Sequence, residues 1–392
     1  MNFSQFLNVD FSLSFWVISG AILLFFIIQL IYYLLVYKRP YSYEHKRSKI
    51  QQVSENLPSI SVVIASKNES ENLAKYLPSI LEQDYHHFEV IVVNMGSTDE
   101  TDILLKAFNQ KYSNLYHTYV PAGVEDLNEK KLALTIGIKA AKNDIVLFTE
   151  AYCVPASEKW IREFAIEFSK GKDIVLGFCK LKIGRKFAMR KFILYDNMIH
   201  GLKYLSLAIL GKPFMGIGRN LAYRKEIFFE EKGFSSVLNI DGGEDDLFIN
   251  KISKKKKVGV VISPESMTQS DVVTNFFTWR AFKSKYLYTK KFYRGASSFI
   301  LGFETFSKYL FYLSVVAGIA YGVLFSNYLL VALSVIFFIF RFIFQLNVIG
   351  NNSRLFGAGK YHINLFFYDI FQPFNNFKFR KYASKRNKPK KR

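Results

Sequence analysis

The chain has 392 residues, of which 50% are apolar and 40 are Phe, and its formal net charge at pH 7 is +21. This length allows one large domain or two ordinary ones. The apolar and aromatic content is high for a soluble enzyme and fits a chain that lies partly in lipid. The two cysteines, Cys153 and Cys179, lack the spacing of metal ligands, so reduced thiols without a structural role are expected.

Residues 11–37 form an uncharged apolar stretch near the start of the chain. In a helix that rises about 1.5 Å per residue, about 20 of them span a hydrocarbon core of about 30 Å. A signal peptide is the alternative, but this run is too long for one, and basic residues follow it instead of preceding it. A second uncharged stretch, residues 309–340, is broken near residues 325–327 and predicts two helices, at about 308–325 and 328–349.

Basic residues follow both apolar regions, first just after residue 37 and then in the carboxyl-terminal sequence KFRKYASKRNKPKKR. The positive-inside tendency places both basic flanks in the cytoplasm. One helix inward and a hairpin out and back satisfy both flanks, so we expect the amino terminus outside the cell and residues 38–306 in the cytoplasm, at the inner or plasma membrane. Residues 361–379 are aromatic, contain Pro373 as an interruption and are too polar to span, which predicts an interfacial or re-entrant segment.

Four parts are therefore expected. They are an N-terminal transmembrane helix (residues 1–37), a cytoplasmic domain with amphipathic interfacial helices near its end (38–307), a transmembrane hairpin (308–349), and an interfacial segment with a basic tail (350–392). Much of the positive charge lies beside the membrane segments, where it would face anionic lipid. Lipid accounts for this charge better than nucleic acid does, because no nucleic-acid-binding module is recognisable.

The cytoplasmic part alternates short branched-apolar runs with amphipathic stretches. Strands are predicted at residues 61–65, 90–93, 115–120, 145–148, 174–178 and 258–262, and helices at 69–82, 99–110, 129–141, 159–169, 186–210 and 244–254. This alternation predicts an α/β fold with a mostly parallel, Rossmann-like sheet and helices on both faces. Ligands bind at the carboxyl ends of the strands in such sheets, and the polar clusters SKNE and NMGSTD follow the first two strands.

The segments SVVIASKNESENLAKYLPSILEQDY and FEVIVVNMGSTDET resemble the beginning of glycosyltransferase family 2, and the resemblance extends over roughly residues 59–288. The membrane segments at both ends are similar to those of membrane-anchored members of that family. The resemblance implies a GT-A fold and an inverting hexosyl transfer from a nucleoside-diphosphate sugar, a UDP- or GDP-sugar, in polysaccharide biosynthesis. A site beside the bilayer implies a lipid-linked or glycan acceptor.

The resemblance assigns the nucleotide to the loops after the first two strands. Asn68 and Glu69 would contact the base and ribose, although Asn68 is also a suitable cap for the following helix. Asn94 and Ser97 lie where the family usually has an Asp-Asp-x-Ser-x-Asp pattern, and the amide of Asn94 can bond a base edge but gives no charge-assisted bond. Asp99 is expected to cap the next helix.

The resemblance assigns the donor diphosphate to a lysine and a carboxylate. Lys130 is the proposed lysine, but the sequence does not separate it from Lys131. Glu150 and Tyr152 occupy the positions of the family's Asp-x-Asp motif, which holds Mg²⁺ or Mn²⁺ against the diphosphate. Glu150 can still bind such an ion, whereas a neutral tyrosine is a poor ligand for it.

The acceptor side and the general base follow from two glycine-containing motifs. Gly216, Gly218 and Asn220 resemble the family's acceptor segment, and glycine permits close backbone approach there. In GGEDDLF, Glu244 matches the family's general base, with Asp245 as the close alternative. Acids at a helix amino terminus are also common for helix stability alone, but three adjoining acids repel one another, and that repulsion can raise a pKa toward that of a useful base.

Lys285 and Tyr286 occupy the positions of Arg and Trp in the family's Gln-x-x-Arg-Trp motif, with Phe282 in place of Gln. The resemblance implies that Lys285 binds the diphosphate as a point charge and that Tyr286 lines the acceptor site. A basic amphipathic helix that lies on the membrane surface is the alternative interpretation of this segment.

The resulting hypothesis is a membrane-bound glycosyltransferase. The alternative is a weakly active or inactive relative that acts as a membrane scaffold in a glycan-assembly complex. It rests on the departures from the family pattern at Asn94, Met95, Tyr152, Phe282 and Tyr286. Against it, carboxylates remain at the metal position and at the base position. No oligomeric state follows from the sequence.

Overall fold

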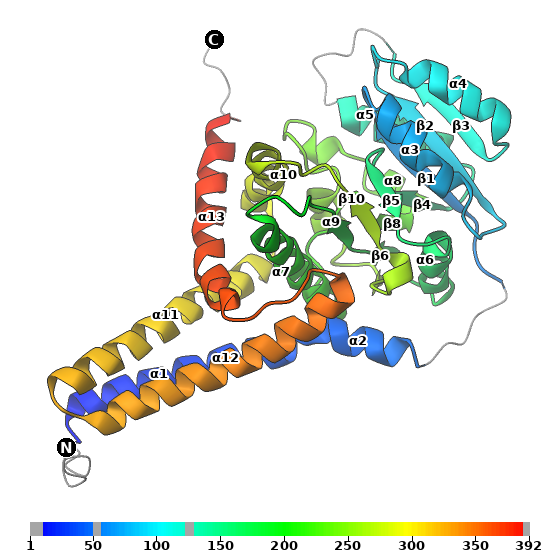
Figure 1. The fold of residues 1–392 in the computed structure, drawn as a ribbon. Helices are drawn as coiled ribbons and strands as arrows, with labels where there is room; N and C mark the ends of the chain where they lie inside the picture. Colours follow the sequence, from blue (N-terminus) through cyan, green and yellow to red (C-terminus); the bar gives the residue numbers. More distant parts are fainter. Residues whose placement is uncertain (1–10, 50–55, 122–128, 387–392) are drawn as a thin grey trace.

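The computed structural model describes residues 11–49, 56–121 and 129–386, and it consists of an α/β domain from which a long helical bundle projects (Figure 1). The first residues of the predicted amino-terminal part and the end of the basic tail, residues 387–392, lie outside the described residues.

The described part of the α/β domain contains a central sheet of seven strands in the order β3-β2-β1-β4-β8-β6-β9. The strands are β1 (Ile60–Ser66), β2 (Phe88–Asn94), β3 (Leu115–Tyr119), β4 (Ile145–Phe148), β6 (Ile174–Leu176), β8 (Leu221–Arg224) and β9 (Val258–Val260). Ile60 pairs with Phe88 on one side and with Ile145 on the other, both in parallel. Only β8 runs antiparallel to its neighbours β4 and β6 among these strands. The prediction of a mostly parallel α/β sheet is confirmed.

Helices cover both faces of this sheet (Figure 1). One face packs against α3 (Ser70–Leu81), α4 (Thr101–Lys111) and α6 (Trp160–Ser169), and the other against α5 (Glu129–Ala140), α7 (Arg190–Ile209) and α9 (Asp246–Ile252). All seven residues of β1 are buried, because alternate side chains enter the two apolar layers. Gly137 of α5 permits a close approach, since a Cβ atom there would lie 2.5 Å from Cγ1 of Val63.

A second, three-stranded sheet lies beside the first. In it β10 (Thr268–Ser270) pairs in antiparallel with β5 (Cys153–Pro155) and in parallel with β7 (Cys179–Leu181). Helix α8 (Lys225–Glu230) follows β8 of the central sheet. Helix α10 (Phe276–Thr289) follows β10 and begins with a capping box between Asn275 and Thr278. Cys153 and Cys179 are both buried and unlinked.

In the part of the chain that the structure describes, three helical segments are long and apolar enough to cross a membrane. The first is α1 (Leu13–Ile31), which continues through a π-helical turn, η2 (Tyr32–Tyr37), into α2 (Arg39–Arg47). The others are α11 (Ser297–Leu324) and α12 (Tyr328–Phe356), which extend past the uncharged stretches of the sequence. The three pack along one another, with the described start of α1 at the end far from the α/β domain (Figure 1).

Small residues bring α11 and α12 into close contact, as is usual for helices in lipid. A Cβ atom on Gly318 of α11 would lie 2.2 Å from the Ser334 hydroxyl of α12 and 3.1 Å from Ile22 of α1. Large apolar side chains on the outside of the bundle stay exposed, such as Leu13 at 80% and Val316 at 62%. This pattern fits helices that face lipid.

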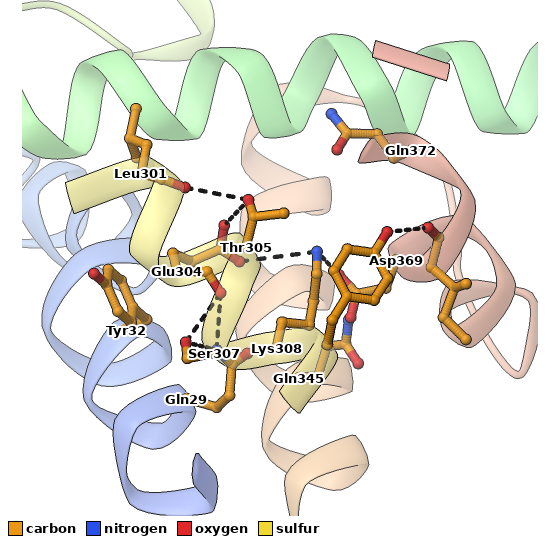
Figure 2. A network of polar contacts seen from close by, with 12 residues as sticks. Gln29, Tyr32, Leu301, Glu304, Thr305, Ser307, Lys308, Gln345, Asp369 and Gln372 are labelled. Atoms are coloured by element: carbon orange, nitrogen blue, oxygen red, sulfur yellow. Dashed lines mark hydrogen bonds and ion pairs between the residues drawn. The ribbon is translucent and has the colours of Figure 1, made fainter. Parts of the chain in front are cut away.

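A buried polar network joins the bundle to the last helix, α13 (Asn364–Arg386) (Figure 2). The Asp369 carboxylate accepts from Lys308 of α11 at 3.1 Å, from Arg341 of α12 at 3.0 Å and from the Tyr312 hydroxyl at 2.9 Å. Glu304 of α11 lies 3.9 Å from the Lys308 ammonium group. Charged groups within membrane segments usually pair inside the bundle in this way.

Helix α13 differs from the sequence expectation because it continues through Pro373 without a break. Proline removes one backbone N–H donor and so leaves a carbonyl of the preceding turn without its helical partner. In the same turn the Tyr309 hydroxyl of α11 donates to the Ile370 carbonyl at 2.7 Å, which ties this part of α13 to the bundle. The helix is not among the segments apolar enough to span.

Candidate active site

The loops after β1 and β2 bind each other at the carboxyl edge of the sheet. Asn68, with a left-handed φ of 54°, accepts from the Thr98 backbone N–H at 2.8 Å through its side-chain oxygen. The Ser97 hydroxyl accepts from the Asn68 backbone at 2.9 Å, and the Asn94 side-chain oxygen accepts from the Ser97 backbone at 2.9 Å. The four residues that the sequence assigned to the nucleotide, including the adjacent Glu69, therefore lie together.

Asp99 holds the two helices that begin at this edge. Its carboxylate accepts from the Ser70 backbone of α3 at 3.0 Å and from the Thr101 backbone of α4 at 3.1 Å. Hydrogen bonds from Thr101 and Ser70 hold the pKa of Asp99 well below its usual value. Asp99 stands one residue before the N-cap of α4, Glu100, and its side chain bonds the first residue of both helices.

Four charged side chains of alternating sign meet next to these loops. Lys130, near the start of α5, is ion-paired with Glu150, and its ammonium group lies 3.5 Å from the Glu244 carboxylate. Lys285 of α10 donates to the same oxygen of Glu244 at 2.6 Å. We call Glu150, Lys130, Glu244 and Lys285 the charge array. It brings together residues that are up to 155 positions apart in the sequence (130 to 285).

The two neighbouring lysines of α5 have different environments. Lys131 is 1% exposed, and its ammonium group donates to the Ile240 carbonyl at 2.6 Å. Burial lowers the pKa of Lys131. Lys130 faces the charge array instead, so the structure separates two residues that the sequence did not.

The three acids of the GGEDD motif have three different environments. Burial alone would raise the pKa of Glu244, but Lys285 and Lys130 hold it well below the usual value. Asp245 accepts from the Gly218 backbone N–H and from the Tyr286 hydroxyl, both at 2.8 Å, through one oxygen. Its other oxygen accepts from the Asp246 backbone at 2.8 Å.

Asp246, which the sequence did not single out, is fully buried and accepts from Thr289 and from the Tyr293 hydroxyl, the latter at 2.7 Å. Burial and the charge of Asp245 raise the pKa of Asp246 to about 7. The expected repulsion among adjoining acids therefore acts mainly on a carboxyl group that lies in the core.

The glycine motif after α7 contributes less to the site than the sequence suggested. Asn220 is 0% exposed, accepts from the Trp160 indole at 2.9 Å and donates to the Phe178 and Ser266 carbonyls, each at 2.9 Å. All of these bonds are internal to the core, so the acceptor-side role of Asn220 stays a prediction that these contacts do not support. Gly216 is also buried, and a Cβ atom there would lie 3.1 Å from Leu176.

A small cavity of about 20 Å³ opens beside the charge array. Lys130, Glu150, Gly218, Glu244 and Asp245 are among the residues that line it. Tyr286, which donates to Asp245, lines a separate and larger cavity of about 100 Å³. The Tyr286–Asp245 pair therefore connects the linings of the two cavities.

The side chains around Glu150 do not provide enough ligands to hold a metal ion without further ligands from a substrate. Over the described ranges, no group of three or more His, Cys, Asp and Glu side chains is arranged to hold an ion. Glu150 is paired with Lys130, and burial together with Glu150 raises the pKa of Tyr152 well above its usual value, so that the phenol stays neutral. Divalent ions of this class prefer several oxygen ligands.

Residues 61–230 match the protein-family model described as Glycosyl transferase family 2. The chain contains a family 2 glycosyltransferase domain. The matched segment begins in β1 and ends in α8, so it includes Asn68, Asn94, Lys130 and Glu150 and ends before the GGEDD motif.

Two curated relatives each match about a third of the chain. Glycosyltransferase AglE of Haloferax volcanii is 31% identical over 129 residues, which are 32% of this chain and 40% of that protein. Poly-beta-1,6-N-acetyl-D-glucosamine synthase of Staphylococcus epidermidis is 27% identical over 128 residues, which are 33% of this chain and 29% of that protein. The aligned part is therefore less than half of either relative.

A solved structure is similar over most of the chain. The mannosyltransferase PcManGT from Pyrobaculum calidifontis, in complex with GDP-Man and Mn²⁺, matches with a TM-score of 0.51 and 17% identity, and the match covers 86% of this chain and 97% of that one. At this identity the likeness concerns the fold, and it confirms the GT-A fold that the sequence predicted.

Proposed function

We propose that the chain is a membrane-bound, inverting glycosyltransferase that transfers a sugar from a UDP- or GDP-sugar to a lipid-linked or glycan acceptor. The charge array is the observation that carries this proposal, because it places two ammonium groups and two carboxylates at the ligand edge of a glycosyltransferase domain. The three apolar helices support attachment to a membrane, and the basic residues that flank them support a domain on its cytoplasmic side.

The donor would bind across the loops after β1 and β2. The oxygens of the Asn68 and Asn94 carboxamides accept bonds within the protein, so their NH₂ groups are the donors directed to the base and ribose. Lys130 and Lys285 would bind the diphosphate. The ammonium group of each lysine lies within 3.5 Å of the Glu244 carboxylate. Glu244 would thus keep both positive charges close to the diphosphate as it leaves and gains negative charge.

We propose that these two ammonium groups supply the positive charge that a divalent ion gives in the family's usual site. Glu150 is the single remaining carboxylate of the Asp-x-Asp position, and Lys130 already neutralises it. The Mn²⁺ in the PcManGT structure belongs to that protein. For this chain, the donor set favours transfer that needs little added metal.

The sequence left Glu244 and Asp245 open as the general base, and the contacts favour Asp245. A base is effective when its pKa lies near the working pH, and the pKa of Glu244 is held well below its usual value by the two lysines. Asp245 lines the small cavity and is bonded to Tyr286, which lines the large one. We propose that Asp245 accepts the proton of an acceptor hydroxyl while that oxygen bonds to the anomeric carbon and the nucleoside diphosphate leaves.

The test is donor turnover by the purified full-length protein in lipid nanodiscs, with a panel of nucleotide sugars, with Mn²⁺ and with a chelator. We expect release of a nucleoside diphosphate from one UDP- or GDP-sugar, with little loss in the chelator. Absence of nucleotide binding at millimolar donor would sink the enzyme proposal. Tight nucleotide binding without turnover or transfer would instead favour the scaffold alternative, which the departures from the family pattern motivate.

A further inference from the structure

The larger cavity lies between the glycosyltransferase domain and the helices next to the membrane. Its volume is about 100 Å³. Its lining comes from the end of β7, from α7, the segment before β8, α10 and the turn after it, the start of α11, and α13. Its walls are mostly aromatic and apolar, including Phe214, Trp279, Phe282 and Tyr293. Such a cavity suits a ligand with a substantial apolar part.

Arg219 is a cation of the cavity wall that no carboxylate pairs among the described residues. It is 6% exposed, and among the described residues no carboxylate lies within ion-pair distance of it. Its Nε atom is buried without a hydrogen-bond partner, and its guanidinium group stacks on Phe282 at 4.1 Å and lies 5.6 Å from the Tyr286 ring. Burial acts to raise the pKa of the neighbouring Cys179 thiol, but Cys153 and Arg219 lower it to about 7, so this thiol is a titratable group of the protein that interacts with Arg219. A buried cation that no carboxylate pairs is suited to an anion that enters the cavity.

The other charged groups of the lining add to this positive field. Lys203, Lys283 and Lys290 line the cavity together with Arg219, whereas Asp196 is the one carboxylate in the lining of this cavity. Asp196 is already ion-paired with Lys283 and accepts from Gln372 at 2.9 Å. Lys203 lies 3.5 Å from Glu304, which is outside the lining.

A histidine in the same wall adds no charge. Burial and Lys283 lower the pKa of His200 to about 3, so its imidazole is neutral at ordinary pH. Its Nε2 atom is buried without a hydrogen-bond partner. The cavity thus combines a surplus of positive charge with a second polar atom that has no partner.

Helix α13 places this cavity next to lipid. Its outer face exposes Phe367, Phe371, Phe374 and Phe377 by 51–60%, whereas Gln372 and Asn376 line the cavity. Aromatic residues on one face and polar residues on the other are typical of a helix that lies in the membrane interface. The same helix is bonded to the membrane bundle through Asp369 (Figure 2).

We propose that this cavity binds the phosphate group of a membrane lipid, with the phosphate at Arg219 and the apolar chain passing along the aromatic wall toward α13. This inference rests on the proposed function, because it identifies that lipid as the acceptor or its carrier. The cavity is well placed for this role, since Tyr286 lines it and donates to Asp245 of the neighbouring small cavity. Charge-assisted bonds from a planar guanidinium group are particularly suited to phosphate.

The test compares binding of a long-chain prenyl phosphate, the corresponding prenol and inorganic phosphate to the full-length protein in detergent. Wild type should bind the prenyl phosphate, and Arg219→Gln should weaken this binding at least about tenfold, with partial recovery in Arg219→Lys. Lys290→Gln, at the edge of the cavity, should weaken it less. Arg354→Gln, an exposed arginine near the end of α12, is the matched control and should bind as wild type does.

Nucleotide binding by each variant checks that the domain is folded. Equal prenyl phosphate binding by wild type and Arg219→Gln, or equal binding of the prenol, would overturn the inference. Competition by inorganic phosphate at the same concentration as the lipid would also overturn it, because it would indicate a site for a soluble anion. If wild type binds nucleotide sugar but not prenyl phosphate, the inference fails alone; if it binds neither, the proposed function fails as well.

Discussion

The buried network around Asp369 gives the sharpest prediction about stability. In Asp369→Asn the side chain keeps its shape but loses its charge, so Arg341 at 3.0 Å and Lys308 at 3.1 Å lose their nearest anion. These groups are 2% and 3% exposed, and the closest remaining carboxylate, Glu304, is 3.9 Å from Lys308. Breaking a buried ion pair by removing one partner costs about 3–5 kcal/mol. The unfolding entropy of a chain of 392 residues is about 0.8 kcal/mol/K, so the predicted fall in unfolding temperature is about 4–6 °C.

The measurement is thermal unfolding in detergent, followed by tryptophan fluorescence. The double variant Asp369→Asn, Lys308→Met should recover part of the loss, because it removes one of the two unpaired cations. Since Asp369 holds α13, the single variant should also bind prenyl phosphate less tightly. An unfolding temperature equal to that of wild type would refute the reasoning, because it would mean that the network contributes no net stability.

Three further predictions concern the charge array and its neighbours. Lys285→Gln should lower kcat/KM for the donor by about 10²-fold, because it removes a cation from the leaving diphosphate. The control Lys251→Gln changes an exposed lysine of α9 and should leave kcat/KM unchanged. The same loss in both variants would argue against a catalytic role for the charge array. A chelator should lower donor turnover less than about tenfold, and complete loss that Mn²⁺ restores would show that the lysines do not replace a metal. The pKa of Asp246 is raised to about 7, so the folded protein binds more protons than the unfolded protein between about pH 4 and 7. The free energy of unfolding of wild type, relative to that of Asp246→Asn, should therefore fall as pH rises through this window. A difference in unfolding free energy that stays constant with pH would exclude the raised pKa.

The sequence predicted the fold where a segment carries its own signal. The buried strands β1, β2 and β4 are continuous branched-apolar runs, since both faces of the sheet are covered. The strands of the second sheet, β5, β7 and β10, have three residues each, which is too short for a periodic pattern to be visible. The antiparallel direction of β8 depends on neighbours far away in the sequence.

The candidate site was predictable where the polar residues follow a strand. Asn68, Asn94 and Glu150 lie at the expected edge for that reason. The core contacts of Asn220 were not predictable, because a polar amide in a glycine-rich turn gives no indication that it bonds a buried indole. Arg219 stands beside it in the sequence and was missed, because only the packed structure shows that it is buried without a carboxylate.

The central claim is that Asp245 is the general base of a glycosyl transfer beside the charge array. The most direct test is the single-turnover rate of transfer from the nucleotide sugar that the protein uses as its donor. Asp245→Asn should lower the rate constant by about 10²–10⁴-fold with donor binding retained. Glu244→Gln should mainly weaken donor binding, because it frees the two lysines from their shared carboxylate. Asp102→Asn, in an exposed ion pair of α4, is the control and should match wild type. Full transfer activity in Asp245→Asn, or an acceptor product that retains the anomeric configuration of the donor, would contradict the account.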